Sequence, residues 1–194
     1  MSNDDILIDH AILRPNFKII SSAKEPVYIS DITLSNSASK GLFYTLSTPA
    51  LNTLAKGYLA LQLTNPSTST KNVYLMQASG YTTALSSSSS NYIQADIYAN
   101  ASLNSTATSL TTHNTNFGSS NTSECTAGYL VKSTTPLSGS PTSIATLIQN
   151  TGASIIINLG GSYIVPPGYN FTIVIFNNTS NQSTTALGLL WLEL

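Results

Sequence analysis

The sequence predicts an all-β fold: an antiparallel β-sandwich of jelly-roll type, with about ten strands and an extended N-terminal arm. Many short runs of alternating or β-branched residues are separated by polar turns, which is typical of a sandwich or barrel. No stretch has a convincing helical period, and no internal repeat is visible. Apolar residues make up 41% of the 194, so the chain has enough of them to form a core and disorder is not expected.

The end of the chain gives the clearest strand signals. Pro167-Gly168 suits the central positions of a type II turn, because proline presets φ and glycine supplies a positive φ. A β-branched and aromatic strand follows over 171–176, then a polar hairpin loop over 177–185, then an apolar last strand over 187–194. Termini fray unless they are tied into a sheet, so we expect this last strand to be interior or well covered.

The remaining strands are shorter or less regular. The best alternation places Leu59, Leu61 and Leu63 on one face of the strand over 57–64, and Ile93 and Ile97 share a face further on. The other expected strands cover 27–34, 42–46, 73–78, 92–99, 129–132, 144–149 and 154–159. We expect a single helical turn over 50–56, a low-complexity loop over 86–90 and a long loop over 100–124 with at most one short strand.

Residues 1–26 are expected to form the arm, and residues 27–194 the sandwich domain. The arm contains short strand-like pieces interrupted by Pro15, and its apolar candidates for an assembly interface are Ile6, Leu7, Ile8, Ile12 and Leu13. Nine of the 15 charged residues lie in the first 40 positions. The segment is either a solvated tail or an assembly element, and it can pack on its own domain or add to a neighbour's sheet.

The composition replaces charge with hydroxyl and amide groups. Ser, Thr and Asn account for 73 residues, and the net charge is −1. This charge offers no basic surface for nucleic acid, and a value near zero favours self-association. The acidic start lacks an apolar core and no run of 18 apolar residues occurs, so we expect neither a Sec-type signal peptide nor membrane insertion. The polar surface suggests an extracellular or spore-surface protein released by cell lysis.

No catalytic, metal or cofactor site is predicted. The histidines are His10 and His113, and no pattern brings either close to Cys125 as a nucleophile–base pair. Four side chains of the arm, Asp4, Asp5, Asp9 and His10, are better explained as a solvated charge run than as metal ligands. Cys125 has no intrachain partner, so it is either a buried small apolar residue or a thiol for an intermolecular bridge.

Several motifs resemble a family of uncharacterised proteins from spore-forming Firmicutes. They cover residues 40–194 and are Asn65-Pro66-Ser67, Asp96-Ile97-Tyr98-Ala99-Asn100, Asn114-Thr115-Asn116-Phe117-Gly118 and Ile164-Val165-Pro166-Pro167-Gly168. The layout is also similar, more remotely, to jelly-roll subunits of endospore appendages, which implies a fibre or coat subunit. Those subunits cross-link through cysteines in their N-terminal connector. Residues 1–26 contain none, so any link through this arm would be non-covalent.

The expected function is therefore structural: a self-assembling subunit of a filament or coat, whose partner is a copy of itself and, as a further option, other surface or coat proteins. An enzyme is not expected. Two other classes stay open. One is a phage or virion decoration or fibre protein, and the other is a lectin-like module that binds carbohydrate, for which the ten tyrosines are candidates.

Overall fold

The computed structural model describes residues 17–22, 25–30, 34–83, 92–150, 152 and 154–194, and the chain divides into two compact units, Met1–Lys40 and Gly41–Leu194. In the first unit, β1 (Phe17–Ser22) pairs antiparallel with β2 (Glu25–Ser30), and α2 (Leu34–Ser39) follows. The sequence predicts an arm over residues 1–26 and a strand of the sandwich over 27–34. The strand prediction is wrong, because Val27–Ser30 belong to β2, which ends at Ser30 and pairs with β1. The helix was missed because six residues are too few to show a helical period.

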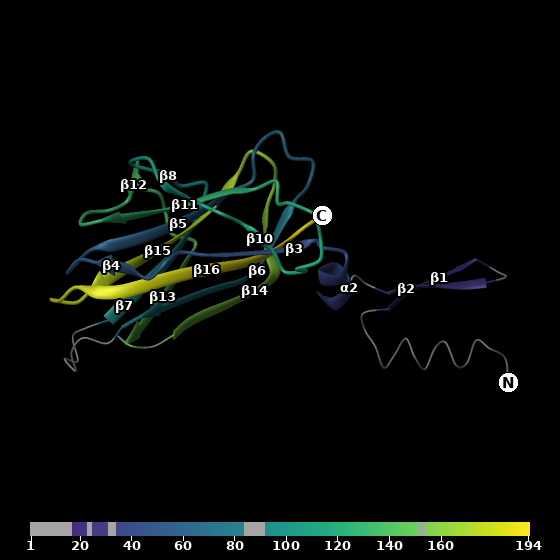
Figure 1. Ribbon diagram of the computed structural model, residues 1–194, viewed down its shortest axis with the longest axis horizontal. Helices are drawn as coiled ribbons and strands as arrows, with labels where there is room; N and C mark the ends of the chain where they lie inside the picture. The colour runs from purple at the N-terminus through teal and green to yellow at the C-terminus, as the bar shows by residue number, and fades with distance from the viewer. Residues whose placement is uncertain (1–16, 23–24, 31–33, 84–91, 151, 153) are drawn as a thin grey trace. The chain divides into compact units, whose positions relative to one another are not determined.

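The second unit has fourteen strands in three sheets among its described residues, and every pairing is antiparallel (Figure 1). The first sheet has the order β10-β3-β16-β6-β14, and β4 also pairs with β16. Its strands are β3 (Phe43–Ser47), β4 (Leu51–Thr53), β6 (Val73–Thr82), β10 (His113–Asn114), β14 (Ser154–Val165) and β16 (Ser183–Glu193). The second has the order β13-β7-β15-β5-β11-β9, with β5 (Tyr58–Thr64), β7 (Tyr92–Ala99), β9 (Thr108–Leu110), β11 (Thr126–Lys132), β13 (Ala145–Asn150) and β15 (Asn170–Asn178). The third pairs β8 (Ser102–Leu103) with β12 (Leu137–Ser138). The all-β prediction is confirmed.

The extra strands lie where the sequence shows no alternation. The predicted helical turn over 50–56 is wrong, because Leu51–Thr53 form β4 and pair with β16. The predicted long loop contains β8, β9 and β10, which have only two or three residues each and so are too short to show an alternating pattern. The predicted strand over 154–159 continues to Val165. A bulge carries it past Gly160 and Gly161, which both have a positive φ.

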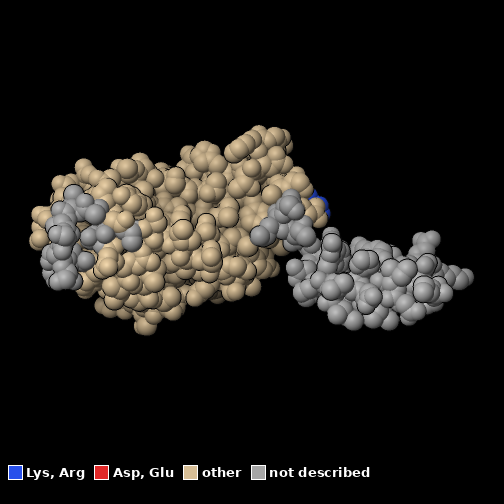
Figure 2. All heavy atoms as spheres, turned by 90° about the horizontal axis from the view of Figure 1, so that it is seen from below, with Lys and Arg blue, Asp and Glu red and all other residues tan. Residues whose placement is uncertain are grey.

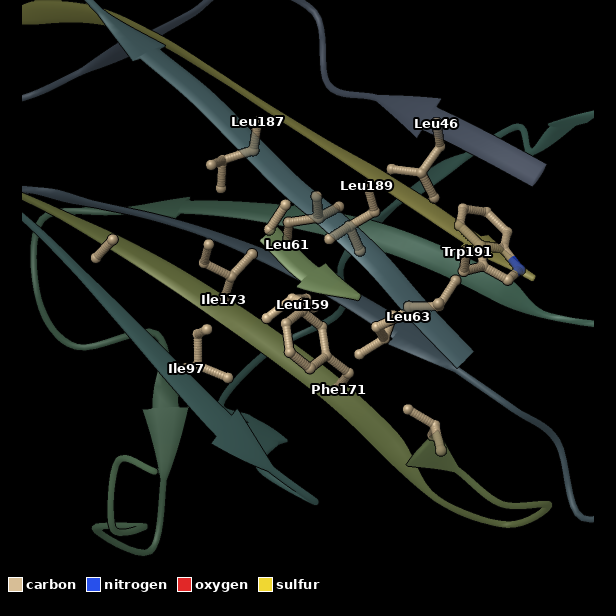
Figure 3. Packing of buried hydrophobic residues seen from close by; sticks show 14 of the residues in the cluster. Leu46, Leu61, Leu63, Ile97, Leu159, Phe171, Ile173, Leu187, Leu189 and Trp191 are labelled. Atoms are coloured by element: carbon tan, nitrogen blue, oxygen red, sulfur yellow. The ribbon is translucent and has the colours of Figure 1, made fainter. Parts of the chain in front are cut away.

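One hydrophobic core lies between the two large sheets. Leu187, Leu189 and Trp191 of β16 meet leucines of β5 and Ile173 of β15 there (Figure 3). The alternation predicted for 57–64 is confirmed, since Leu59, Leu61 and Leu63 are all buried in this core. Each such leucine contributes roughly 1.5–3 kcal/mol by leaving water.

The last strand is interior, as predicted. β16 lies between β3 and β6, and its Trp191 ring stacks on Tyr44 with the ring centroids 6.0 Å apart. The turn that precedes β15 is also confirmed, because Gly168 has a φ of 85° and Tyr169 N donates to Pro166 O at 3.2 Å.

A second, smaller cluster covers the outer face of the β5–β15 pair. Ala60 and Val174 pack there against Ala101, which precedes β8, and against Leu137 of β12. The chain between β7 and β13 therefore covers part of the outer face of the second sheet.

Candidate assembly surfaces and a charged clasp

One side of the sandwich ends in β13, of six residues, and β14, of twelve; together we call them the long edge. Figure 1 draws both along its lower side. β13 pairs with β7 and β14 pairs with β6, and within the described residues neither has a strand on its other side. Neither strand contains Asp, Glu, Lys, Arg or Pro. Charge and proline are the usual means of protecting an edge from pairing with another chain, so the long edge lacks both.

The long edge also exposes apolar side chains. Ile148 of β13 and Ile156 of β14 are each 59% exposed, and Ile164 of β14 and Ile144, which immediately precedes β13, are about half exposed. The face seen in Figure 2, from the side where Figure 1 draws the long edge, shows one small patch of Lys or Arg atoms and no Asp or Glu atoms. This surface therefore presents unpaired backbone and isoleucine rather than charge.

One carboxylate lies close to the long edge without protecting it. Asp96 of β7 is only 9% exposed. It accepts hydrogen bonds from the Gln94 amide at 2.8 Å and from the Thr146 hydroxyl of β13. Its charge is therefore directed into local hydrogen bonds, one of which ties β13 to β7.

The opposite side, which we call the short edge, ends in β9 in the second sheet and in β10 and the three-residue β4 in the first. β9 has three residues and pairs with β11, and β10 has two residues and pairs with β3. Such short strands offer little backbone to another chain, which is itself a way of limiting edge pairing. The two sides of the same sandwich thus end differently.

Three charged residues gather at one end of the sheets and form what we call the clasp: Lys71, Glu124 and Glu193. Lys71 Nζ lies 3.0 Å from Glu124 Oε1 and 3.9 Å from Glu193 Oε2. Ser69 Oγ donates to Glu124 Oε2 at 2.6 Å, and Thr70 N donates to the same oxygen at 3.2 Å. These donors and Lys71 lower the pKa of Glu124, and the hydrogen bond with Glu124 is the main cause that raises the pKa of Lys71.

Glu193 is the buried member of the clasp, with 1% of its surface exposed. It accepts hydrogen bonds from Trp191 Nε1 at 3.0 Å, from Glu124 N at 3.2 Å and from Ser123 Oγ. The clasp therefore ties β16 to the loop after β5 and to the segment before β11. We interpret it as a structural cross-link, because its carboxylates are directed at donors of the fold itself.

Cys125 lies next to the clasp and is buried in the main core, with 7% exposed. Burial, followed by the negative charge of Glu193, raises the pKa of its thiol to about 12. The thiolate is the form that attacks a disulfide, so the folded chain holds this thiol in an unreactive state. Of the two alternatives for Cys125, this environment is that of a buried apolar residue.

The other predicted residues are not brought together. Ile6, Leu7, Ile8, Ile12 and Leu13 lie outside the described residues, as do Asp4, Asp5, Asp9 and His10. His113 is exposed on β10 whereas Cys125 is in the core. Among the described residues, no three His, Cys, Asp or Glu side chains are grouped to hold a metal ion, and no helix is long and apolar enough to cross a bilayer.

Sequence reasoning missed the clasp and the long edge. Residues 41–194 carry only six charges, and three of them form the clasp, so their rarity was the available signal. Comparison of the chain with protein-family models and with curated proteins finds no match. The resemblance to spore-former proteins stays a prediction.

Proposed function

We propose that this chain is a structural subunit that assembles with copies of itself into a filament or coat on an extracellular or spore surface. The observation that carries the proposal is the long edge. β13 and β14 present unpaired backbone with no charge or proline, together with exposed isoleucines. A strand of a neighbouring copy would continue either sheet there and cover the isoleucines.

The arm supplies the second contact. Its apolar residues, Ile6, Leu7, Ile8, Ile12 and Leu13, would dock on a neighbouring copy, at roughly 1.5–3 kcal/mol for each side chain that becomes fully buried. A contact between two different surfaces propagates as a ring or as a helical fibre. The absence of cysteine from residues 1–26 makes this link non-covalent.

The strand order supports a jelly roll as the finer description of the fold. Four antiparallel pairs are nested along the chain: β3 with β16, β5 with β15, β6 with β14, and β7 with β13. The members of successive pairs alternate between the two large sheets. Jelly-roll domains have eight strands in two sheets and recur in viral capsids. A virion or phage subunit is therefore the alternative with the same support, and the neighbouring genes would distinguish it from a spore protein.

Negative-stain electron microscopy of the full chain at neutral pH tests the proposal. We expect ordered fibres, rings or sheets, and a variant lacking residues 1–16 should remain folded by circular dichroism but stay unassembled. A full-length variant with serine at the five apolar arm positions is the matched control for chain length. Assembly of both variants would show that the arm is not needed, and discrete monomers of the full chain would contradict self-assembly itself.

A further inference from the structure

The loop over residues 111–123, which we call the polar loop, includes β10 and leads towards β11. Several hydrogen bonds hold it against the start of β3. Asn114 Nδ2 donates to Gly41 O at 2.8 Å and to Asn121 O at 3.2 Å, and Thr115 N donates to Phe43 O at 3.0 Å. These bonds hold Asn114, Thr115 and Asn121 in place, which lowers the entropy cost of binding a ligand in the loop.

Gly41 shows how closely the loop packs against its support. Its φ is 66°, and a Cβ atom at this position would clash with Ser119 Oγ. Only glycine combines that backbone conformation with such a close approach. Gly41, just before β3, therefore helps to fix the position of the polar loop, in addition to the residues of the loop itself.

Residues of the polar loop line a hollow of about 560 Å³ that is open to solvent. This volume falls within the roughly 300–1,000 Å³ of small-molecule sites. Hydroxyl and amide side chains dominate the lining, among them Thr112, Asn116, Ser120 and Asn121; the imidazole of His113 also contributes to it, and no Asp, Glu, Lys or Arg does. Each of these groups can both donate and accept hydrogen bonds.

An aromatic ring stands beside this hollow. Phe117 is 98% exposed and contributes to the lining. Phe43 and Phe171, by contrast, are buried in the sandwich. Phe117 therefore adds nothing to the core, and its ring offers a flat apolar surface next to hydroxyl and amide groups.

We propose that the polar loop binds a neutral carbohydrate. A pyranose ring has a flat face of C–H bonds, which packs on an aromatic ring, and a rim of hydroxyl groups, which exchange hydrogen bonds with Ser, Thr and Asn side chains. A phosphate, a sulfated or sialylated sugar, or a nucleic acid is bound best by Lys or Arg, and the lining of this hollow contains neither. This site is separate from the long edge, so glycan binding and self-assembly are independent properties of the chain.

A printed glycan array with neutral and acidic glycans, probed with the full-length protein, tests the proposal. We expect saturable binding to neutral glycans, and acidic glycans should bind no better than their neutral counterparts. Phe117→Ala should weaken binding by about tenfold or more, which corresponds to a loss of about 1.4 kcal/mol. Tyr81→Ala, which removes another half-exposed aromatic ring on β6, is the matched control and should bind as the parent does.

Two results would overturn the glycan site. One is that no glycan binds above background, and the other is binding that Phe117→Ala leaves unchanged. If Phe117→Ala instead abolished assembly without any glycan binding, the polar loop would belong to a subunit contact and the proposal would be wrong. Circular dichroism of each variant shows whether it is folded.

Discussion

The long edge and the short edge belong to the same two sheets but present different surfaces. The long edge ends in strands of six and twelve residues without a charge, and the short edge ends in strands of three and two residues. The few charges of the second unit are not used to protect the long edge, since three of the six form the clasp and Asp96 is nearly buried. A long, uncharged, apolar edge is a liability for a monomer, so its presence favours cover by another chain.

The largest expected effect comes from placing charge on the long edge. In the double variant Ile148→Lys and Ile156→Lys, two exposed isoleucines are replaced by residues that carry an ammonium group. Folding should be unaffected because neither residue is in the core. Assembly should be lost, since lysine on an edge strand opposes pairing with another chain. Electron microscopy and sedimentation velocity measure the result.

A lysine on the short edge is the matched control. Ser109 is exposed on β9, so Ser109→Lys adds charge to the other side with little effect on packing. Fibres of this variant should match those of the parent. If Ser109→Lys prevented assembly as fully as the double variant does, the two edges would be equivalent and the distinction between them would fail.

The next largest effect is expected from the clasp, and it concerns stability rather than assembly. Glu193→Ala removes the carboxylate that accepts the Trp191 N–H in the core, and an unsatisfied buried donor costs about 1–3 kcal/mol. The lost bonds to Ser123 and Glu124 add to this cost. The free energy of unfolding in urea should fall accordingly.

Glu193→Gln is the conservative comparison, because it keeps one acceptor oxygen and removes the charge. It should lose less stability than Glu193→Ala, and both variants should still form fibres below their unfolding midpoints. Equal stability of Glu193→Ala and the parent would show that the clasp is not a structural cross-link.

The sequence predicted strands well where an apolar face alternates with a polar one. The strand over 57–64 is confirmed for this reason, because burial of one face leaves a two-residue period. The interior last strand is confirmed for another, since it was predicted from an apolar run at a chain end that would otherwise fray. β4 and β9 were missed because they are too short to show that period. The jelly-roll prediction was based on the number and spacing of the strands. It did not specify which strands pair, because a pair such as β3 and β16 joins residues far apart in the chain.

The surfaces were harder to predict than the fold. The sequence identifies Glu124 and Glu193 as rare charges, but only the fold brings positions so far apart to Lys71. In the same way, nothing local marks the strands over 145–150 and 154–165 as the edges of two sheets, since edge position depends on which strands pair. The arm residues, including Ile6 and Leu13, remain a prediction.

A smaller effect is expected from pH. Glu124 has a lowered pKa, so its contribution to stability is complete above its ordinary pKa of 4.5 and is lost as the pH falls through the folded value. Lys71 has a raised pKa, so its contribution is complete below 10.5 and is lost as the pH rises through the folded value. Between these two pH limits, the Lys71–Glu124 pair should therefore make a constant contribution to the free energy of unfolding. Glu124→Gln should flatten the acid side of the profile measured by thermal unfolding, and an unchanged acid side would show that the pair contributes nothing.

The smallest effect, none at all, is expected from reductant. Cys125 is buried and its thiol pKa is about 12, so at pH 8 the thiol stays protonated and away from solvent. Native protein should not react with a thiol reagent such as Ellman's reagent until it is unfolded, and fibres should look the same with and without reductant. Cys125→Ala should also assemble, with a modest loss of stability from the small cavity it leaves. Fibres that dissolve in reductant would place Cys125 in a bridge between subunits. That outcome would require the segment before β11 to open on assembly, and the long edge would then not be sufficient to hold the subunits together.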